Sequence, residues 1–268
     1  MKILLLGGTR DAIELAKQLI TLSETSALNI ELTYSLAGLV RQPPLTCAIH
    51  KGGFSQYTES SSTSSINKGS KPKIQSQQGL KQFLLQHKID KVIDATHPYA
   101  TTISSNTSVV CKALNIPLLT FCRPAWQAGA EDQWVLVDNW DKAKEAMHPF
   151  RRPFVTIGRS AINEADSIPE HQFWLIRSAI TDKLNQANYQ IIKAIGPFSE
   201  EQELSLMKAH DIDVVVCKNS GGSAVDGKLK AARTLKIPVI MLNRPKTTDE
   251  PKYDLKYNHI QELINALV

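Results

Sequence analysis

The string Asp94-Ala-Thr-His-Pro-Tyr-Ala100 combines residues that do chemistry with residues that shape the backbone. It follows an apolar run and precedes an amphipathic one, so it lies where a strand meets a helix. Pro98 suits the first turn of that helix, because a missing N–H costs least there. His97 is then presented at the strand end, ready to donate a proton or bind a carboxylate. Tyr99 can stack on a ligand or donate to it, and Thr96 can cap the helix.

A second junction of this kind follows the first apolar run of the chain and consists of Gly7, Gly8, Thr9 and Arg10. Glycines let the backbone approach a pyrophosphate, and the start of a helix offers free N–H groups. The string lacks the G-x-G-x-x-G pattern of dinucleotide-binding proteins. A tight turn without a ligand therefore stays an alternative.

The next predicted strand, about residues 30–36, ends where an adenosine ribose would lie. The residues there are small: Ser35, Ala37 and Gly38. No acid is present to bind a ribose diol, and Arg41 follows instead. An arginine suits a 2′-phosphate, so the pattern favours NADP(H) over NAD(H). A solvated Arg41 is the alternative.

Lys218-Asn-Ser-Gly-Gly222 forms a third turn between a strand and a helix. Gly221 and Gly222 expose backbone N–H groups, and Lys218 and Ser220 add donors, which is typical of an anion-binding nest. Arg159 and Arg177 place further cations at predicted strand ends. Solvation is the alternative for each single arginine, but their shared placement favours a site.

The elements that must position these residues alternate as strand and helix along most of the chain, which predicts parallel sheets covered by helices. The stretch from Ile89 to Arg123-Pro124 is repeated from Ile212 to Arg244-Pro245, with matching Ile-Pro and Arg-Pro ends. We therefore expect two α/β halves, residues 1–130 and 131–268. A cleft between them at the carboxyl ends of the strands is the expected ligand site.

One segment departs from this alternation. Residues 55–79 are mostly Ser, Thr, Gln, Lys and Gly, and they cannot bury enough apolar surface to offset the entropy of ordering. We expect a flexible insertion there, and an active-site lid is the alternative.

Composition excludes several classes of protein. The 268 residues are 42% hydrophobic and carry a net charge of +5 without a dense basic run, so we expect no nucleic-acid partner. The four cysteines and seven histidines show no metal-ligand spacing, and we expect no metal site. Neither a signal peptide nor a membrane span is expected, so we predict a cytoplasmic protein, monomeric or weakly homodimeric.

Taken together, these strings resemble the precorrin-6A reductase family of the cobalamin pathway, cobalt-precorrin-6A reductases included. The likeness covers nearly the whole chain in order. It rests on the Gly7-Gly-Thr turn, Ser35-Leu-Ala-Gly38, Gly52-Gly-Phe54, Asp94–Ala100, Arg123-Pro-x-Trp126, Thr156-Ile-Gly-Arg159, Gly196-Pro-Phe198, Lys218–Gly222 and Ile237-Pro-Val-Ile240. Family members run from Gly-Gly-Phe almost directly into Gly-Leu, whereas residues 55–78 interrupt that junction here.

The resemblance implies two Rossmann-like domains and reduction of one double bond of precorrin-6A by a nicotinamide cofactor. It implies NADPH, with NADH possible, bound by Gly7, Gly8, Thr9, Arg10, Ser35, Ala37, Gly38, Arg41 and Thr96. The macrocycle carries many carboxylates, which the expected substrate-binding residues would hold: Arg123, Arg159, Lys218, Ser220, Gly221 and Gly222. His97 and Tyr99 are the expected catalytic residues, as candidate proton donors.

Three alternatives stay open at this point. The substrate can be cobalt-precorrin-6A, reduced with NADH. A tetrapyrrole enzyme of the uroporphyrinogen-III synthase kind also uses two α/β lobes and needs no nucleotide. A non-catalytic dinucleotide sensor would bind cofactor without turnover, although a second anion nest has no obvious use in a sensor.

Overall fold

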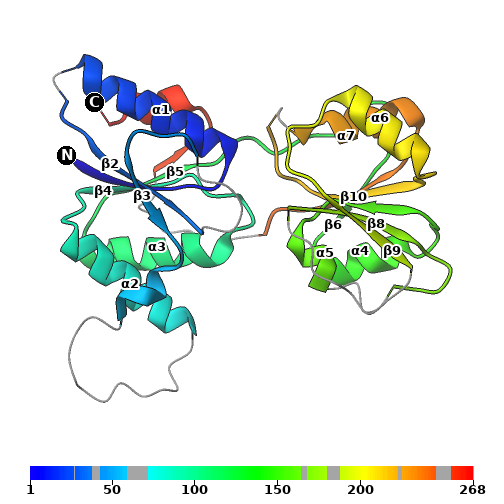
Figure 1. The fold of residues 1–268 in the computed structure, drawn as a ribbon, viewed down its shortest axis with the longest axis horizontal. Helices are drawn as coiled ribbons and strands as arrows, with labels where there is room; N and C mark the ends of the chain where they lie inside the picture. Colours follow the sequence, from blue (N-terminus) through cyan, green and yellow to red (C-terminus); the bar gives the residue numbers. More distant parts are fainter. Residues whose placement is uncertain are drawn as a thin grey trace. The chain divides into compact units, whose positions relative to one another are not determined.

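The computed structural model describes residues 1–26, 28–37, 43–58, 72–163, 168–179, 188–222, 225–245 and 255–267. The chain divides into two compact units. The first comprises Met1–Arg123 and Lys246–Val268, and the second comprises Pro124–Pro245. Each unit is a parallel sheet with helices on both faces (Figure 1), as the alternation of strands and helices predicts.

The first unit holds a six-stranded sheet in the order β3-β2-β1-β4-β5-β12. All five neighbouring pairs run parallel. The strands are β1 (Lys2–Leu6), β2 (Glu31–Leu36), β3 (Ala48–Lys51), β4 (Lys91–Asp94), β5 (Leu118–Phe121) and β12 (Leu255–Tyr257). The order is that of a dinucleotide-binding sheet.

Helices α1 (Arg10–Thr25) and α8 (Ile260–Asn265) cover one face of this sheet (Figure 1). Helices α2 (Pro72–Gln86) and α3 (Thr101–Leu114) cover the other, together with the short 3₁₀ helix η1 (Phe54–Thr58). Alternate β1 residues serve the two faces, because successive strand side chains point in opposite directions. Leu5 packs in the core under α1 and α8, and Leu4 packs in the core under α2 and α3.

The second unit repeats this plan in the order β9-β8-β7-β10-β11-β6. Its strands, all parallel, are β6 (Trp134–Val137), β7 (Pro153–Val155), β8 (Trp174–Ser178), β9 (Tyr189–Lys193), β10 (Val214–Lys218) and β11 (Val239–Leu242). Helices α6 (Glu200–Ala209) and α7 (Gly227–Leu235) lie on one face, and α4 (Trp140–Met147) and α5 (Arg159–Asn163) lie on the other (Figure 1). Ser199 caps α6 and forms a capping box with Gln202.

The internal repeat corresponds to β4-α3-β5 in the first unit and β10-α7-β11 in the second. Helices α3 and α7 end alike, because Asn115 and Lys236 both adopt the left-handed conformation that terminates a helix. Each repeat closes on Arg-Pro, and the chain changes unit at both places, after Arg123 and after Pro245. One edge strand of each sheet, β6 or β12, is therefore the first strand that the chain forms after it changes unit.

These crossings make the units differ from the expected halves, 1–130 and 131–268. The change of unit falls between Arg123 and Pro124, and residues 255–267 return to the first unit. β12 pairs with β5 there, and Leu263 of α8 is buried in the core beneath α1. A three-residue strand carries too weak a pattern to be recognised without its partner.

The expected flexible insertion at 55–79 needs correction where the structure describes it. Residues 54–58 form η1, and α2 begins at Pro72, whose fixed φ suits the first helical position. Gly79 lets α2 approach η1 closely, because a Cβ there would lie 1.8 Å from the carbonyl oxygen of Phe54. Residues 59–71 lie outside the described residues.

Across the described ranges, none of the helices has the length and apolar character needed to span a membrane. In the same residues, no three His, Cys, Asp or Glu side chains gather in a way that could hold a metal ion.

Candidate functional site

A cavity of about 440 Å³ opens at the carboxyl ends of β1 to β4 in the first unit. The strand order reverses between β1 and β4, which is where ligands bind in open α/β sheets. Seven of the residues expected from the sequence lie around this cavity: Gly7, Gly8, Ser35, Ala37, Thr96, His97 and Tyr99. Its other walls include Leu36, Gly52, Gly53, Phe54, Ser76, Ile103 and Asn106.

The turn after β1 is shaped by Tyr34, a residue that the sequence reasoning missed. Gly8 has a φ of 106°, a conformation that favours glycine, and its N–H donates to the Tyr34 hydroxyl at 2.9 Å. The tyrosine ring lies directly against Gly7, where a Cβ would come within 2.2 Å of it. Burial raises the pKa of Tyr34, so this hydroxyl stays protonated.

Thr9 and Arg10 begin the helix that follows. The Thr9 hydroxyl caps α1 by accepting from Ala12 N–H at 3.0 Å, and it donates to the Ala95 carbonyl at 2.9 Å. The exposed Arg10 is the first residue of α1. The first N–H groups of the helix therefore face the carboxyl end of the sheet, with the positive end of the helix dipole.

Arg123 has a different environment from the one expected for a substrate-binding cation. It follows β5 and forms an ion pair with Asp11 in the first turn of α1, within the first unit. The pair ties the start of α1 to the end of the sheet. It also neutralises the carboxylate of Asp11, which follows the glycine turn in the sequence.

His97, Tyr99 and Thr96 follow β4 as the sequence predicts, but the expected helix start is wrong. Helix α3 begins at Thr101 with Ala100 as its N-cap, so Thr96 does not cap it and Pro98 lies before its first turn. The hydroxyl and N–H of Thr96 both donate to Asp94, at 2.7 and 3.0 Å, which fixes the strand end. Tyr99 N–H donates to Nδ1 of His97 at 3.3 Å, and the two rings lie 5.5 Å apart. Because Nδ1 accepts a hydrogen bond, the neutral imidazole carries its proton on Nε2.

Ser35 belongs to a buried relay that the sequence did not reveal. The Gln56 amide nitrogen lies 3.0 Å from Nε2 of His50, and Nδ1 of His50 lies 2.9 Å from the Ser35 hydroxyl. The amide can only donate, so His50 carries its proton on Nδ1 and donates to Ser35. Burial and the nearby His87 lower the pKa of His50, which keeps the ring neutral. Gly38 and Arg41 lie outside the described residues.

In the second unit, Lys218 and Arg159 also stand at the carboxyl ends of strands. Lys218 ends β10, and its ammonium group lies 3.4 Å from the Ser160 hydroxyl in the first turn of α5. Arg159 is the exposed first residue of α5. Burial lowers the pKa of Lys218. These groups lie at the point where the order of the second sheet reverses, between β7 and β10.

The glycines expected to form an anion nest have a structural role in the fold. A Cβ at Gly221, whose φ is 68°, would lie 2.1 Å from the Pro124 carbonyl oxygen. The Gly222 carbonyl accepts from the indole N–H of Trp126 at 3.0 Å. Arg244 donates to the carbonyl of Ser220 at 3.2 Å. Close packing against Pro124 therefore requires Gly221 whether or not a ligand binds, and Gly222 has a φ of 80°, a conformation that favours glycine.

The two sheets can be aligned by their pairing. Phe154 of β7 packs in the core with residues of α6 and α7, as Leu4 of β1 packs with residues of α2 and α3. We therefore align the next residues, Val155 and Leu5, each of which pairs with the strands on both sides. In this alignment Arg177 of β8 stands where Ser35 stands on β2. The face that carries the cavity in the first unit is therefore the face of α6 and α7 in the second.

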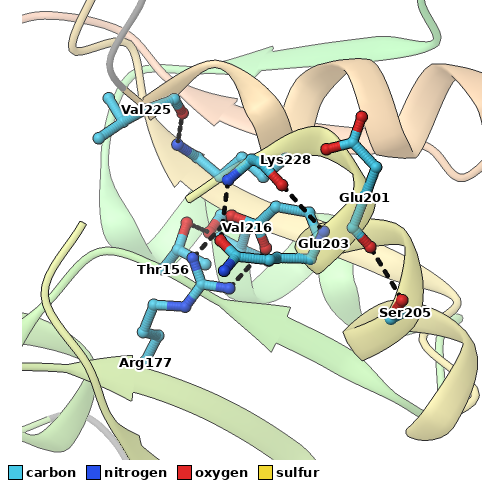
Figure 2. Close-up of polar contacts among 10 residues, drawn as sticks. Thr156, Arg177, Glu201, Glu203, Ser205, Val216, Val225 and Lys228 are labelled. Atoms are coloured by element: carbon cyan, nitrogen blue, oxygen red, sulfur yellow. Dashed lines mark hydrogen bonds and ion pairs between the residues drawn. The ribbon is translucent and has the colours of Figure 1, made fainter. Parts of the chain in front are cut away.

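On this face of the second unit, Arg177 and Glu203 form a buried ion pair (Figure 2). Their two nitrogen–oxygen contacts measure 2.7 and 2.5 Å, and both side chains are buried. The guanidinium stacks over Phe198, 3.9 Å from the ring centre. Lys228 of α7 donates to the Val225 carbonyl at 2.6 Å beside this pair, and burial lowers its pKa. The position that corresponds to Ser35 of the first unit is thus held by a buried ion pair in the second.

Comparisons of sequence and of structure with known proteins all find similarity to the same family, along nearly the whole chain. The family model described as precorrin-6x reductase CbiJ/CobK matches residues 2–267. A precorrin-6A reductase of Sinorhizobium sp is 35% identical over 93% of this chain and 87% of its own length. A cobalt-precorrin-6A reductase of Methanocaldococcus jannaschii is 25% identical over 100% of this chain and 98% of its own length. The solved structure of CobK precorrin-6A reductase superposes with a TM-score of 0.81 at 28% identity, covering 100% of this chain and 96% of that chain.

Proposed function

The chain belongs to the precorrin-6x reductase CbiJ/CobK family, whose members reduce a carbon–carbon double bond of the macrocycle in cobalamin biosynthesis, and from this premise we propose how its residues divide the work. We propose that the first unit binds the nicotinamide cofactor and that cations of the second unit bind the macrocycle. The observation that carries the proposal is the contrast between the two aligned sheets. One has a cavity at its switch point beside Ser35, and the other carries the buried pair of Arg177 and Glu203 at the matching position.

A reductase of this family uses a nicotinamide cofactor, which supplies the hydride when bound. The residues of the first unit fit such a group. The cavity adjoins the glycine turn and the start of α1, where N–H groups and the helix dipole suit a pyrophosphate. The buried Asn106 also lines the cavity, and its amide nitrogen has no hydrogen-bond partner within the described part of the chain, which suits a hydrogen-bonding ligand.

We propose NADPH as the cofactor. The Ser35 hydroxyl accepts from His50, so its own proton is available for an acceptor in the cavity, such as a phosphate oxygen. No acid stands on β2 at this position to bind a ribose diol. Arg41 is proposed as the partner of the 2′-phosphate.

We propose that His97 provides the proton that completes the reduction. Its Nδ1 is held by the Tyr99 N–H, which places the ring proton on Nε2. The donating form is the imidazolium, which is protonated on both ring nitrogens, so in this proposal the ring takes up a proton at Nδ1 and leaves the Tyr99 N–H before it gives one to the substrate. Tyr99 then orients the ring, and Thr96 holds the end of β4.

Lys218 and Arg159 are the proposed partners of substrate carboxylates, with Ser220, Gly221 and Gly222 in the adjoining loop. Arg123 is already paired with Asp11, so we propose that its charge serves the cofactor end of the first unit. Identity to proteins named precorrin-6A reductase, up to 35%, exceeds identity to the cobalt enzymes, up to 29%, which supports a metal-free substrate.

The test is a titration of purified protein with NADPH and precorrin-6A, with and without cobalt, read as NADPH oxidation. Faster oxidation with the metal-free macrocycle is the expected result. An oxidation rate unaffected by either macrocycle would overturn the proposal. Arg41→Ala should raise the KM for NADPH more than that for NADH, and equal effects would remove the 2′-phosphate role.

A further inference from the structure

The side chain of Asn106 has an unusual environment on the second turn of α3. It is completely buried and lines the cavity of the first unit. Its oxygen accepts a hydrogen bond from the Gln77 amide of α2 at 3.0 Å. Its nitrogen, Nδ2, has no hydrogen-bond partner among the residues that the structure describes.

A buried donor without a partner is rare in folded proteins, because it has lost its water without gaining another acceptor. Gln77 fixes the orientation of the Asn106 amide. The amide nitrogen of Gln77 donates to the amide oxygen of Asn106. The amide nitrogen of Asn106 therefore faces the remaining space. The pair therefore holds one N–H donor ready for an acceptor brought by a ligand.

The position of Asn106 indicates which part of the dinucleotide carries that acceptor. The glycine turn suits the pyrophosphate, and the end of β2 suits the adenosine ribose. Beyond the ribose position the cavity is bounded by apolar groups, including Leu36, Phe54 and Ile103. A flat aromatic ring fits such walls, and adenine has ring nitrogens that accept hydrogen bonds.

We infer that Asn106 donates a hydrogen bond from Nδ2 to a ring nitrogen of the adenine of the bound dinucleotide. Gln77 is the positioning residue that holds the amide in this orientation. The inference rests on the proposed function, since it assigns a base-binding role within the proposed cofactor cavity. It adds a residue that recognises the base, where the glycine turn and Ser35 recognise only phosphate and ribose.

The experiment uses ADP as the probe, with the dissociation constant measured by calorimetry on the full chain. Asn106→Leu should weaken ADP binding about tenfold, the effect of one lost neutral hydrogen bond. Gln77→Leu should weaken it less, because the donor remains but is no longer oriented. For both variants the KM for NADPH should rise in proportion to the loss of ADP affinity, a correlation that general structural damage would not produce.

Thr107→Val is the matched control. Thr107 is equally buried on the same helix, and its hydroxyl donates to the Ile103 carbonyl rather than lining the cavity. This variant should lose stability without losing ADP affinity. Equal ADP affinity in Asn106→Leu and wild type would overturn the inference while leaving the proposed function intact. Wild-type protein that binds neither ADP nor NADPH would overturn both.

A measurement on the wild type covers the case in which the Asn106 variants do not fold. Three ADP analogues replace one adenine ring nitrogen each with carbon: 1-deaza-, 3-deaza- and 7-deaza-ADP. One of them should bind about tenfold more weakly than ADP. In folded Asn106→Leu that analogue and ADP should bind equally. Three analogues that all match ADP in the wild type would overturn the inference.

Discussion

The hydroxyl of Tyr34 accepts a hydrogen bond from the backbone N–H of Gly8, and the same ring packs against Gly7. The Tyr34 side chain thus packs beneath the glycine turn and fixes the position of the turn relative to β1 and β2. One N–H of the turn is used for this purpose. In the proposed cofactor site, a phosphate at this turn would therefore be bound by the N–H groups at the start of α1.

Tyr34→Phe keeps the ring and removes the hydrogen bond. We expect the free energy of unfolding to fall by about 1 kcal/mol, and the KM for NADPH to rise a few-fold with kcat retained. Gly7→Ala should cost more, roughly 1–3 kcal/mol, because the new methyl group meets the tyrosine ring. Gly129→Ala, where a Cβ would make ordinary contact with Asp132, is the control. Urea denaturation gives the comparison, and a Gly7→Ala protein as stable as Gly129→Ala would contradict the packing argument.

Because the pKa of His50 is lowered in the folded protein, we expect a loss of stability in mild acid. Its folded-state pKa lies below 6.5, so below about pH 6.5 the unfolded chain binds a proton that the folded chain does not. Stability therefore falls as the pH drops from 6.5 through the lowered folded-state pKa. His50→Phe should flatten this part of the stability–pH curve, measured by urea denaturation between about pH 8 and pH 5. An unchanged slope would show that other groups cause it.

The buried pair of Arg177 and Glu203 gives a prediction about the second unit. Glu203→Leu leaves a buried guanidinium without its counter-charge, and we expect a loss of about 3–5 kcal/mol. Arg177→Met combined with Glu203→Leu should recover most of that loss, since both charges are then gone. ADP affinity should not change in either protein. If the double variant were less stable than Glu203→Leu, the pair would be stabilising in itself.

Replacement of His97 separates proton donation from binding. His97→Asn should lower kcat by about 100-fold or more, with the KM for NADPH changed only slightly. Tyr99→Phe should have a small effect, because the backbone N–H that orients His97 remains. Steady-state kinetics with precorrin-6A measures both. Should Tyr99→Phe cause the larger fall in kcat, the proton donor would be the tyrosine.

Lys218→Gln should raise the KM for precorrin-6A about 10- to 100-fold, the range for a lost hydrogen bond to a charged group. The KM for NADPH should be unaffected. Lys208→Gln, at the exposed end of α6, provides the control for a changed net charge. Because burial lowers the pKa of Lys218, substrate affinity should fall as the pH rises through that lowered value. Equal substrate KM values for the two variants would exclude Lys218 from the site.

The sequence was sufficient to predict what depends on local pattern. Apolar runs and turn residues predicted the parallel sheets, and the strand-end strings around Gly7 and His97 do lie at one cavity. Tyr34, His50 and Asn106 were missed because their roles depend on partners in other strands or helices. Asn106 did leave a signal, since it falls on the apolar stripe of α3 with Ile103 and Val110.

Other misses have physical causes of their own. The start of α2 carried a recognisable signal, because proline is favoured at the first helical position, but the polar composition around Pro72 outweighed it. β12 could not be recognised, since three half-exposed or exposed residues become a strand only by pairing with β5. The role of Arg123 depends on Asp11, which is 112 residues away in the sequence.

The exchange of edge strands has a consequence for synthesis on the ribosome. The second unit can complete its sheet once β11 has emerged, because β6 precedes it in the chain. The first unit must wait for β12, so its β5 edge stays open while more than a hundred residues are translated, which takes on the order of ten seconds at about 5–20 residues per second. An open strand edge is a site for mispairing, and a chaperone that covers β5 during this interval would protect the nascent protein. The N-terminal unit is the first to begin folding and the last to finish.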